Sequence, residues 1–358
     1  MNRRLRKIWI CGDVWMDILP SFERAELGLK IALLSDRFDV LVDAHFDGKS
    51  EFTLWREIII GEGIGPEPTL SVNIDDKMLD FPLPDRPLHN KIRFKDLQIE
   101  YIDHSVIEFL RSNKQIWDRM GTKLGLDVRS DETEDEQPIW DIFVRQIWPL
   151  FVTNIRHLRI DYADDLDNLR SRTSPTILTD LDQLHSINTG LLLPDPICDD
   201  GPNATAGQAL SKWLHTPSKN GQPKRFYRHD YMGPLNLEWV NSFKEAFANA
   251  TNSSVRYKIQ FAVYKTSIEE PFESVNERTK EKLTLEKLPC SAGDWLLKRY
   301  PISENAAAIQ WENDENCDDN LNKVTFDFCW GDINESIGPL SPPPAEEEKE
   351  KADESNKK

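Results

Sequence analysis

The chain has 358 residues, of which 39% are hydrophobic and 30% are charged, and its formal net charge is −18. That acidity opposes general binding to phosphate backbones or anionic lipid, because both require clustered Lys and Arg. No apolar run is long enough to span a membrane, and the basic start lacks the apolar stretch of a secretory signal. The five cysteines are scattered, which is typical of free thiols in a reducing compartment. We therefore expect a cytoplasmic or nuclear protein that binds neither nucleic acid nor membranes.

The first predicted element is a helical module at residues 8–47. Asp13 is placed to cap a first helix, and Pro20 should end or kink it. Its apolar residues Val14, Ile18 and Phe22 recur at helical spacing. A second helix is expected from Ala25, with a stripe of Leu27, Ile31, Leu34 and Phe38. Because apolar residues lie on more than one side of these helices, part of their surface should be covered by another structure.

Residues 48–90 are predicted to form a β-hairpin followed by a Pro-rich linker. The hairpin strands are expected at 52–60 and 70–74, and the linker is "FPLPDRPL" at 81–88. The glycine run at 61–65 follows a strand, as a phosphate-binding loop would. However, it lacks the final glycine of that motif, and prolines follow where a helix should open. We interpret this run as a connecting loop.

From residue 91, strand-like and helix-like segments alternate. The predicted strand centres are Leu97, Leu126, Leu158, Ile187, Tyr227 and Ile259. Regular strand–helix alternation implies parallel strands joined by right-handed crossovers. We therefore expect repeat-like α/β structure over residues 91–330. It would be an irregular leucine-rich-repeat-like solenoid or, alternatively, a single mixed sheet, with the helices on one side.

Two segments close the sequence. "AAAIQWEN" at 306–313 and "KVTFDFCW" at 323–330 are predicted to be strands, which would form a hairpin that covers the last edge of the sheet. Residues 331–358 are Pro-rich and then highly charged, so we expect a disordered acidic tail.

Familiar catalytic and metal-binding motifs are absent from the sequence. The sequence has no Gly-x-Ser-x-Gly elbow, Walker loop, His-Glu-x-x-His motif or paired Cys-x-x-Cys site. No catalytic, cofactor-binding or metal-binding residue is therefore predicted, no cofactor is expected, and the chain is not expected to be an enzyme. The acidic run at 130–137 is interpreted as a solvated loop, with docking of a basic partner as the alternative.

Residues 13–38 resemble the F-box, a helical module that binds a Skp-type adaptor subunit. "DVWMDIL" at 13–19 matches the opening acidic–apolar part of the family pattern. Phe22, Arg24, Glu26 and Leu27 follow in register, and "LLSDRF" at 33–38 matches the closing apolar run. The whole chain also resembles F-box-like proteins expanded in plant-parasitic nematodes. That likeness lies in "RFDVLVDAHF" at 37–46, "ALSKWLHTP" at 209–217 and "NGQPKRF" at 220–226.

This resemblance implies a substrate-recognition adaptor of a Skp–cullin–F-box ubiquitin ligase, with an unidentified protein substrate held by the repeat region. By motif position, it assigns the partner-binding face to Ile10, Val14, Trp15, Ile18, Leu33 and Phe38. The alternative is a non-catalytic interaction scaffold whose degenerate F-box does not bind the ligase. That alternative depends on the sequence at 10–12, where the Leu-Pro pair that usually opens an F-box has no proline.

Overall fold

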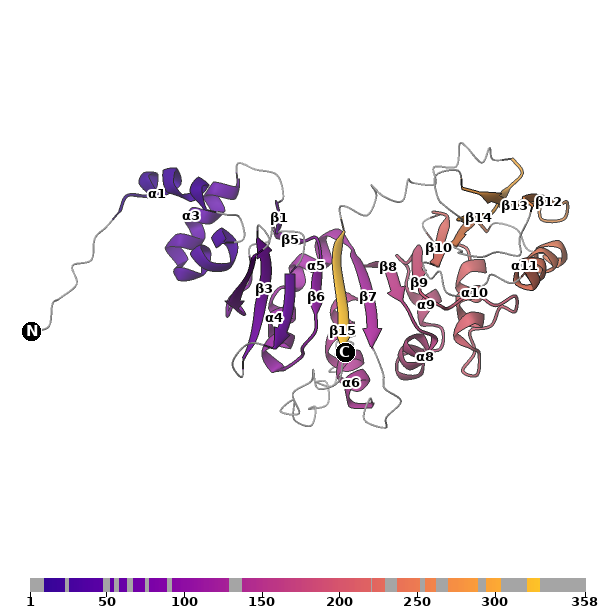
Figure 1. Cartoon of the computed structure of the whole chain (residues 1–358), viewed down its shortest axis with the longest axis horizontal. Coiled ribbons are helices and arrows are strands. Elements are labelled where there is room, and N and C mark those ends of the chain that lie inside the picture. The colour runs from indigo at the N-terminus through magenta and orange to yellow at the C-terminus, as the bar shows by residue number, and fades with distance from the viewer. Residues whose placement is uncertain are drawn as a thin grey trace, which may run out of the picture.

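The computed structural model of the chain (Figure 1) describes residues 10–22, 26–47, 52–54, 58–62, 67–74, 77–88, 92–128, 137–219, 221–228, 237–251, 255–261, 270–288, 294–303 and 321–328. Its main feature is a mixed sheet of 13 strands, in the order β12-β13-β14-β11-β10-β9-β8-β7-β15-β6-β2-β3-β4. A separate parallel pair joins β1 (Phe52–Leu54) and β5 (Ile92–Phe94). The protein is therefore α/β, and its sheet is the single mixed sheet that the sequence offered as the alternative to a solenoid.

The centre of the sheet is parallel and its two ends are antiparallel. The parallel strands are β2 (Ile58–Glu62), β6 (Leu97–Ile99), β15 (Asn322–Phe328), β7 (Thr122–Val128), β8 (Ile155–Ile160), β9 (Ser186–Thr189), β10 (Lys224–Arg228) and β11 (Tyr257–Phe261). At one end, β3 (Pro68–Ile74) and β4 (Lys77–Pro82) pair antiparallel. At the other end are β14 (Trp295–Pro301), β13 (Glu281–Lys287) and β12 (Phe272–Asn276).

Helices connect the parallel strands, as the alternation predicted. They are α4 (His104–Ser112) and α5 (Lys114–Met120) before β7; α6 (Gln137–Ile142), a π-helical turn (Phe143–Ile147) and α7 (Trp148–Phe151) before β8; α8 (Ala163–Arg172) and α9 (Ile177–Asp180) before β9; α10 (Ala206–His215) before β10; and α11 (Leu237–Asn249) before β11. Local signals set the helix starts. The Asp103 carboxylate accepts from the Val106 N–H at 2.9 Å, and Thr205 with Gln208 forms a capping box on α10.

One face of the sheet is apolar and carries the core. A continuous register row crosses the sheet through Ile58, Leu97, Val324, Leu124, Leu158, Ile187, Phe226, Ile259 and Leu297, and each of these side chains is at most 1% exposed. These residues share one core cluster with the buried residues of the helices. Because successive side chains of a strand point to opposite faces, the neighbouring row must face the other way. That row is polar and is described with the candidate site.

The last strand of the chain lies in the middle of the sheet. β15 pairs in parallel with β6 on one side and with β7 on the other, as Figure 1 shows in yellow. The sequence predicted that this segment would cover an outer edge, and that prediction is wrong. The physical reason is burial: Val324, Phe326 and Phe328 are at most 1% exposed, which an edge position beside solvent would not provide. The companion segment predicted at 306–313 lies outside the described residues.

The sheet crosses the segment boundary predicted at residue 90. β2, from the predicted hairpin region 48–90, pairs in parallel with β6 of the predicted repeat region. β2 and β3 form the predicted hairpin, but the first part of the strand predicted at 52–60 is β1, which pairs with β5 instead. Part of the predicted linker at 81–88 forms the end of β4. Strands β12, β13 and β14 were missed, although Leu283 and Leu285 alternate with polar residues as a half-buried strand requires.

The described part of residues 10–47 is helical and contains no strand. It comprises α1 (Gly12–Ile18), a 3₁₀ turn (Leu19–Ser21) at Pro20, a π-helical turn (Leu27–Ile31), a 3₁₀ turn (Ala32–Leu34) and α3 (Asp36–Asp47). The second helix is not continuous as predicted, because Ser35 is extended and its hydroxyl accepts from the Phe38 N–H at 3.5 Å. An exposed ion pair of 2.6 Å between Arg86 and Asp36 joins these helices to the segment after β4.

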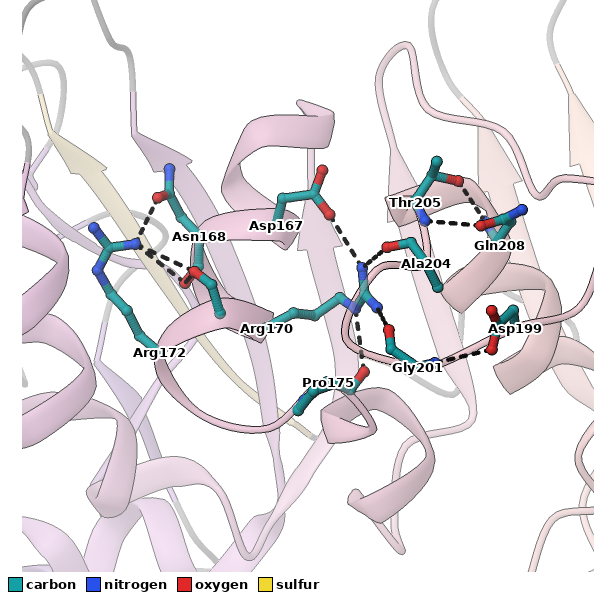
Figure 2. A network of polar contacts seen from close by, with 11 residues as sticks. Asp167, Asn168, Arg170, Arg172, Pro175, Asp199, Gly201, Ala204, Thr205 and Gln208 are labelled. Carbon is teal, nitrogen blue, oxygen red and sulfur yellow. Dashed lines mark hydrogen bonds and ion pairs between the residues drawn. The ribbon is translucent and has the colours of Figure 1, made fainter.

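A buried arginine fixes the long connection between β9 and α10. The Arg170 guanidinium on α8 donates to the backbone oxygens of Ala204 at 2.7 Å, Gly201 at 3.1 Å and Pro175 at 3.1 Å (Figure 2). It also contacts the Asp167 carboxylate at 3.2 Å, while its own side chain is only 5% exposed. Burial raises the pKa of Asp167, against the opposing effect of Arg170. The arginine therefore satisfies two carbonyls of the connection between β9 and α10, and the Pro175 carbonyl between α8 and α9.

Candidate functional site

The N-terminal helices divide their apolar residues into two sets. The first set packs in the core: Leu19, Leu27, Leu29, Ala32, Val42 and Phe46 are buried, with Met16, Phe22, Ile31 and Leu41 partly buried against them. The second set contains the six residues that the F-box resemblance assigned to a partner. None of the six belongs to the core cluster, and Val14 is 46% exposed.

The structure brings part of the second set together. The rings of Trp15 on α1 and Phe38 on α3 meet edge to face, with their centroids 4.8 Å apart. The Arg37 guanidinium donates to the backbone oxygen of Ile10, which ties the start of α1 to α3. Two further residues outside the core, Leu34 and Val40, are 62% and 65% exposed. The sequence placed Leu34 on the packing stripe of the second helix and gave Val40 no role, so it predicted neither as a surface residue.

A second candidate site lies on the polar face of the sheet. The register row on this face runs through Gln98, Thr325, Gly125, Arg159, Asn188, Tyr227 and Gln260. Apart from Gly125, these residues are partly exposed, in contrast to the apolar row on the opposite face. The alternation follows from the strand sequences, because residues i and i+2 share a face.

A pocket of about 240 Å³ opens on this face over β6, β15, β7 and β8. Its lining residues are Asp96, Gln98, Leu126, Asp127, Arg159, Lys323, Thr325 and Asp327. Gly125 lies within the same strip and lacks a side chain; a Cβ there would approach the Thr325 hydroxyl to 3.1 Å. The site was missed from sequence because its residues come from four strands that are far apart along the chain.

The charged side chains of the pocket form ion pairs, and one of them accepts a hydrogen bond from an amide. The Arg159 guanidinium binds the Asp161 carboxylate at 2.7 Å, and Lys323 pairs with Asp96. The Gln98 amide donates to Asp327 at 3.1 Å. The hydrogen bond to Asp161 raises the pKa of Arg159 against the effect of burial, and the carboxylates of Asp127 and Asp327 act in the same direction. Arg159 therefore stays charged and lies in the field of several carboxylates.

A thiol–imidazole contact lies beside α10, on the connection from β9. The Cys198 sulfur is 3.4 Å from Nδ1 of His215, and that nitrogen is 2.9 Å from the Ser211 backbone oxygen. Because a carbonyl only accepts, Nδ1 must carry a proton and cannot take one from the thiol. Burial lowers the pKa of His215 to about 4, so the ring is neutral near pH 7. The arrangement does not activate Cys198 as a nucleophile.

Within the ranges that the structure describes, no group of three or more His, Cys, Asp and Glu side chains is arranged to hold a metal ion. No described helix is both long enough and apolar enough to cross a membrane. The acidic run at 130–137 lies almost wholly outside the described residues.

Comparison with known proteins gives no relative to set beside this geometry. No family model matches the chain, and neither the curated proteins nor the solved structures contain a match.

Proposed function

We propose that this protein is a substrate-recognition adaptor of a Skp–cullin–F-box ubiquitin ligase. Its N-terminal helices would bind the Skp-type subunit, and its repeat-like sheet region would hold a protein substrate. The observation that carries the proposal is the division of the N-terminal apolar residues. The residues expected to bind the partner are those that the chain's own core leaves out.

Burial explains why this division favours a partner. Val14, Leu34 and Val40 expose between 46% and 65% of their surface, and Trp15 and Phe38 are partly exposed beside each other. Exposed apolar side chains beside a partly exposed aromatic pair are a feature of interaction surfaces. Each anchor that a partner buries would contribute on the order of 1–3 kcal/mol.

The substrate-binding part of the proposal is supported by strand order. β7, β8, β9, β10 and β11 follow one another both in sequence and in the sheet, as in a leucine-rich-repeat-like array. They present a partly exposed polar face away from the core. The insertion of β15 between β6 and β7 interrupts this order, so the repeat-like region would be an irregular one.

Co-purification tests the adaptor role. The 358-residue chain should retain a Skp-type subunit, and Ile18→Asp should lose it because Ile18 is partly exposed on the proposed face. Circular dichroism of the two proteins must agree, so that lost docking is distinguished from lost folding. If the wild-type chain retains no Skp-type subunit at micromolar concentration, the adaptor role is excluded.

The second candidate function is a non-catalytic scaffold with a degenerate F-box. One observation favours it: α1 begins at Gly12 after an extended Cys11, without the proline that usually opens the module. The scaffold would still bind a protein through the sheet face. Absence of Skp binding together with retained binding at the sheet face would support this function.

A further inference from the structure

The pocket on the polar sheet face has an excess of negative charge. Three carboxylates line it, from Asp96, Asp127 and Asp327, against two cations, Arg159 and Lys323. A fourth carboxylate, Asp161, already binds Arg159 through two nitrogens, at 2.7 and 3.0 Å. With the adjacent Asp161 and Lys123, which lies opposite Lys323 on the same face, this region carries four negative groups against three positive ones. This balance favours a cationic ligand.

The strand register places two of these carboxylates side by side. Asp327 on β15 is the register partner of Asp127 on β7, and four residues earlier Lys323 is the partner of Lys123. The two strands thus repeat the pattern Lys-x-x-x-Asp on one face, with Thr325 opposite Gly125 between the charges. Like charges at adjacent cross-strand positions repel, and Arg159 in the same pocket attracts both carboxylates.

The size and chemistry of the pocket restrict the kind of ligand that it can bind. Its volume of about 240 Å³ lies below the ~300–1,000 Å³ typical of small-molecule sites, which favours a single side chain. Two adjacent carboxylates suit a planar guanidinium, because its five donors reach two acceptors at once, whereas an ammonium is a compact point charge. The net charge of −18 would also attract basic partners over a longer range.

We propose that the pocket over β15 and β7 binds an arginine side chain of a protein partner, with Asp127 and Asp327 as the carboxylates that accept from its guanidinium. In the adaptor, this would be the anchor residue of the substrate, so the biological role of the pocket rests on the proposed function. The binding chemistry itself does not depend on the Skp-type subunit.

The test is a nuclear magnetic resonance titration of the full-length chain with capped Gly-Ser-Arg-Ser-Gly peptide. The amide signals of Gly125 and Thr325 should shift saturably. The same peptide with citrulline, the neutral isostere of arginine, should not shift them, and a lysine peptide should bind more weakly. A higher salt concentration should weaken binding of the arginine peptide, because the pocket is partly open to solvent and its charges are screened.

Matched variants separate the pocket from the overall field. Asp127→Asn combined with Asp327→Asn should lower the affinity for the arginine peptide about tenfold. Glu273→Gln combined with Glu286→Gln removes the same charge from β12 and β13, at the far end of the same sheet face, and should leave binding unchanged. Thermal melting of both double variants verifies that they remain folded. If a double variant does not fold, the single Asn variants are titrated in its place.

Several results would overturn the proposal. They are no saturable shift with the arginine peptide, equal binding of the citrulline or lysine peptide, or equal weakening by the control double variant. Spermidine that displaces the arginine peptide at a lower concentration would make the site one for small polyamines instead. The titration contains no Skp-type subunit, so the two proposals are tested separately. A negative peptide titration would leave the proposed Skp binding intact, and absence of Skp binding would leave the arginine-binding result intact.

Discussion

Asp127 and Asp327 occupy opposite positions on neighbouring parallel strands, and both line the same pocket. One comes from the first half of the chain and the other from its last described strand. Two carboxylates held side by side repel, and the Arg159 guanidinium in the same pocket is hydrogen-bonded to Asp161, so neutralising one of the two should make the fold more stable. A charge pair that serves only the structure would show the opposite effect.

Neutralising Asp127 should therefore stabilise the protein slightly. We expect Asp127→Asn to raise the free energy of unfolding by ~0.2–1 kcal/mol, measured by urea denaturation. Asp161→Asn, which removes the carboxylate bound to Arg159, should lower it instead. A clear loss of stability in Asp127→Asn would show that this carboxylate is structural.

The central position of β15 predicts a large cost for truncating its core residue. Phe326 is fully buried, and its ring centroid lies 5.2 Å from that of Phe143. Phe326→Ala should lower the free energy of unfolding by ~3–5 kcal/mol. Phe272→Ala on β12, the outer strand of the sheet, should cost less, because that side chain is only partly buried. Equal costs in urea denaturation would contradict the placement of β15.

Local patterns predicted most elements between residues 104 and 261, because helices and strands there carry clear periods in their apolar residues. The position of β15 could not be predicted in this way. Val324 and Phe326 indicate a buried strand, but nothing in their spacing says that Val324 is the partner of Leu97 and Leu124, which lie far earlier in the chain. Pairing between strands so far apart in the sequence depends on packing of the whole core and not on the local sequence.

The same reasoning explains the candidate sites. The F-box resemblance assigned six partner-binding residues from one local motif; none of the six is in the core cluster, one is exposed and five are partly exposed. The pocket has no local motif: Asp96, Asp127, Arg159 and Asp327 meet only when four strands align. The repeated Lys-x-x-x-Asp pattern on β7 and β15 was present in the sequence, but without the register it had no meaning.

Removing the buried guanidinium of Arg170 should loosen the connection between β9 and α10. Arg170→Met removes the guanidinium donor from the carbonyls of Pro175, Gly201 and Ala204, of which Gly201 still accepts from the Ala204 N–H, and this should cost ~3 kcal/mol. Hydrogen exchange of amides at 199–204 should also accelerate. Arg111→Met is the matched control, because its ion pair with Glu108 is largely exposed and should contribute less than ~0.5 kcal/mol. Similar losses in both variants would refute this role.

Because Lys224 is buried, we expect the free energy of unfolding to rise with pH. Burial lowers its pKa to about 7 from the ordinary 10.5, so between these values the folded chain binds fewer protons than the unfolded chain. Stability then increases with pH in this window, by at most ~1.4 kcal/mol per unit, and the penalty is complete below about pH 7. Lys224→Met should lack this increase when unfolding is compared at about pH 7.5 and about pH 9.5. Parallel pH profiles of the two proteins would contradict the prediction.

The most direct test of the adaptor role is calorimetric titration of a purified Skp-type subunit with two valine variants of the full-length chain. Val14 on α1 and Val275 on β12 are exposed to almost the same extent, 46% and 47%. Each is changed to Asp, so that residue type, exposure and added charge are matched. Wild type and Val275→Asp should bind with equal micromolar or tighter affinity, and Val14→Asp should bind at least about tenfold more weakly. A wild-type chain that does not bind, or a Val14→Asp chain that binds like wild type, would contradict the account.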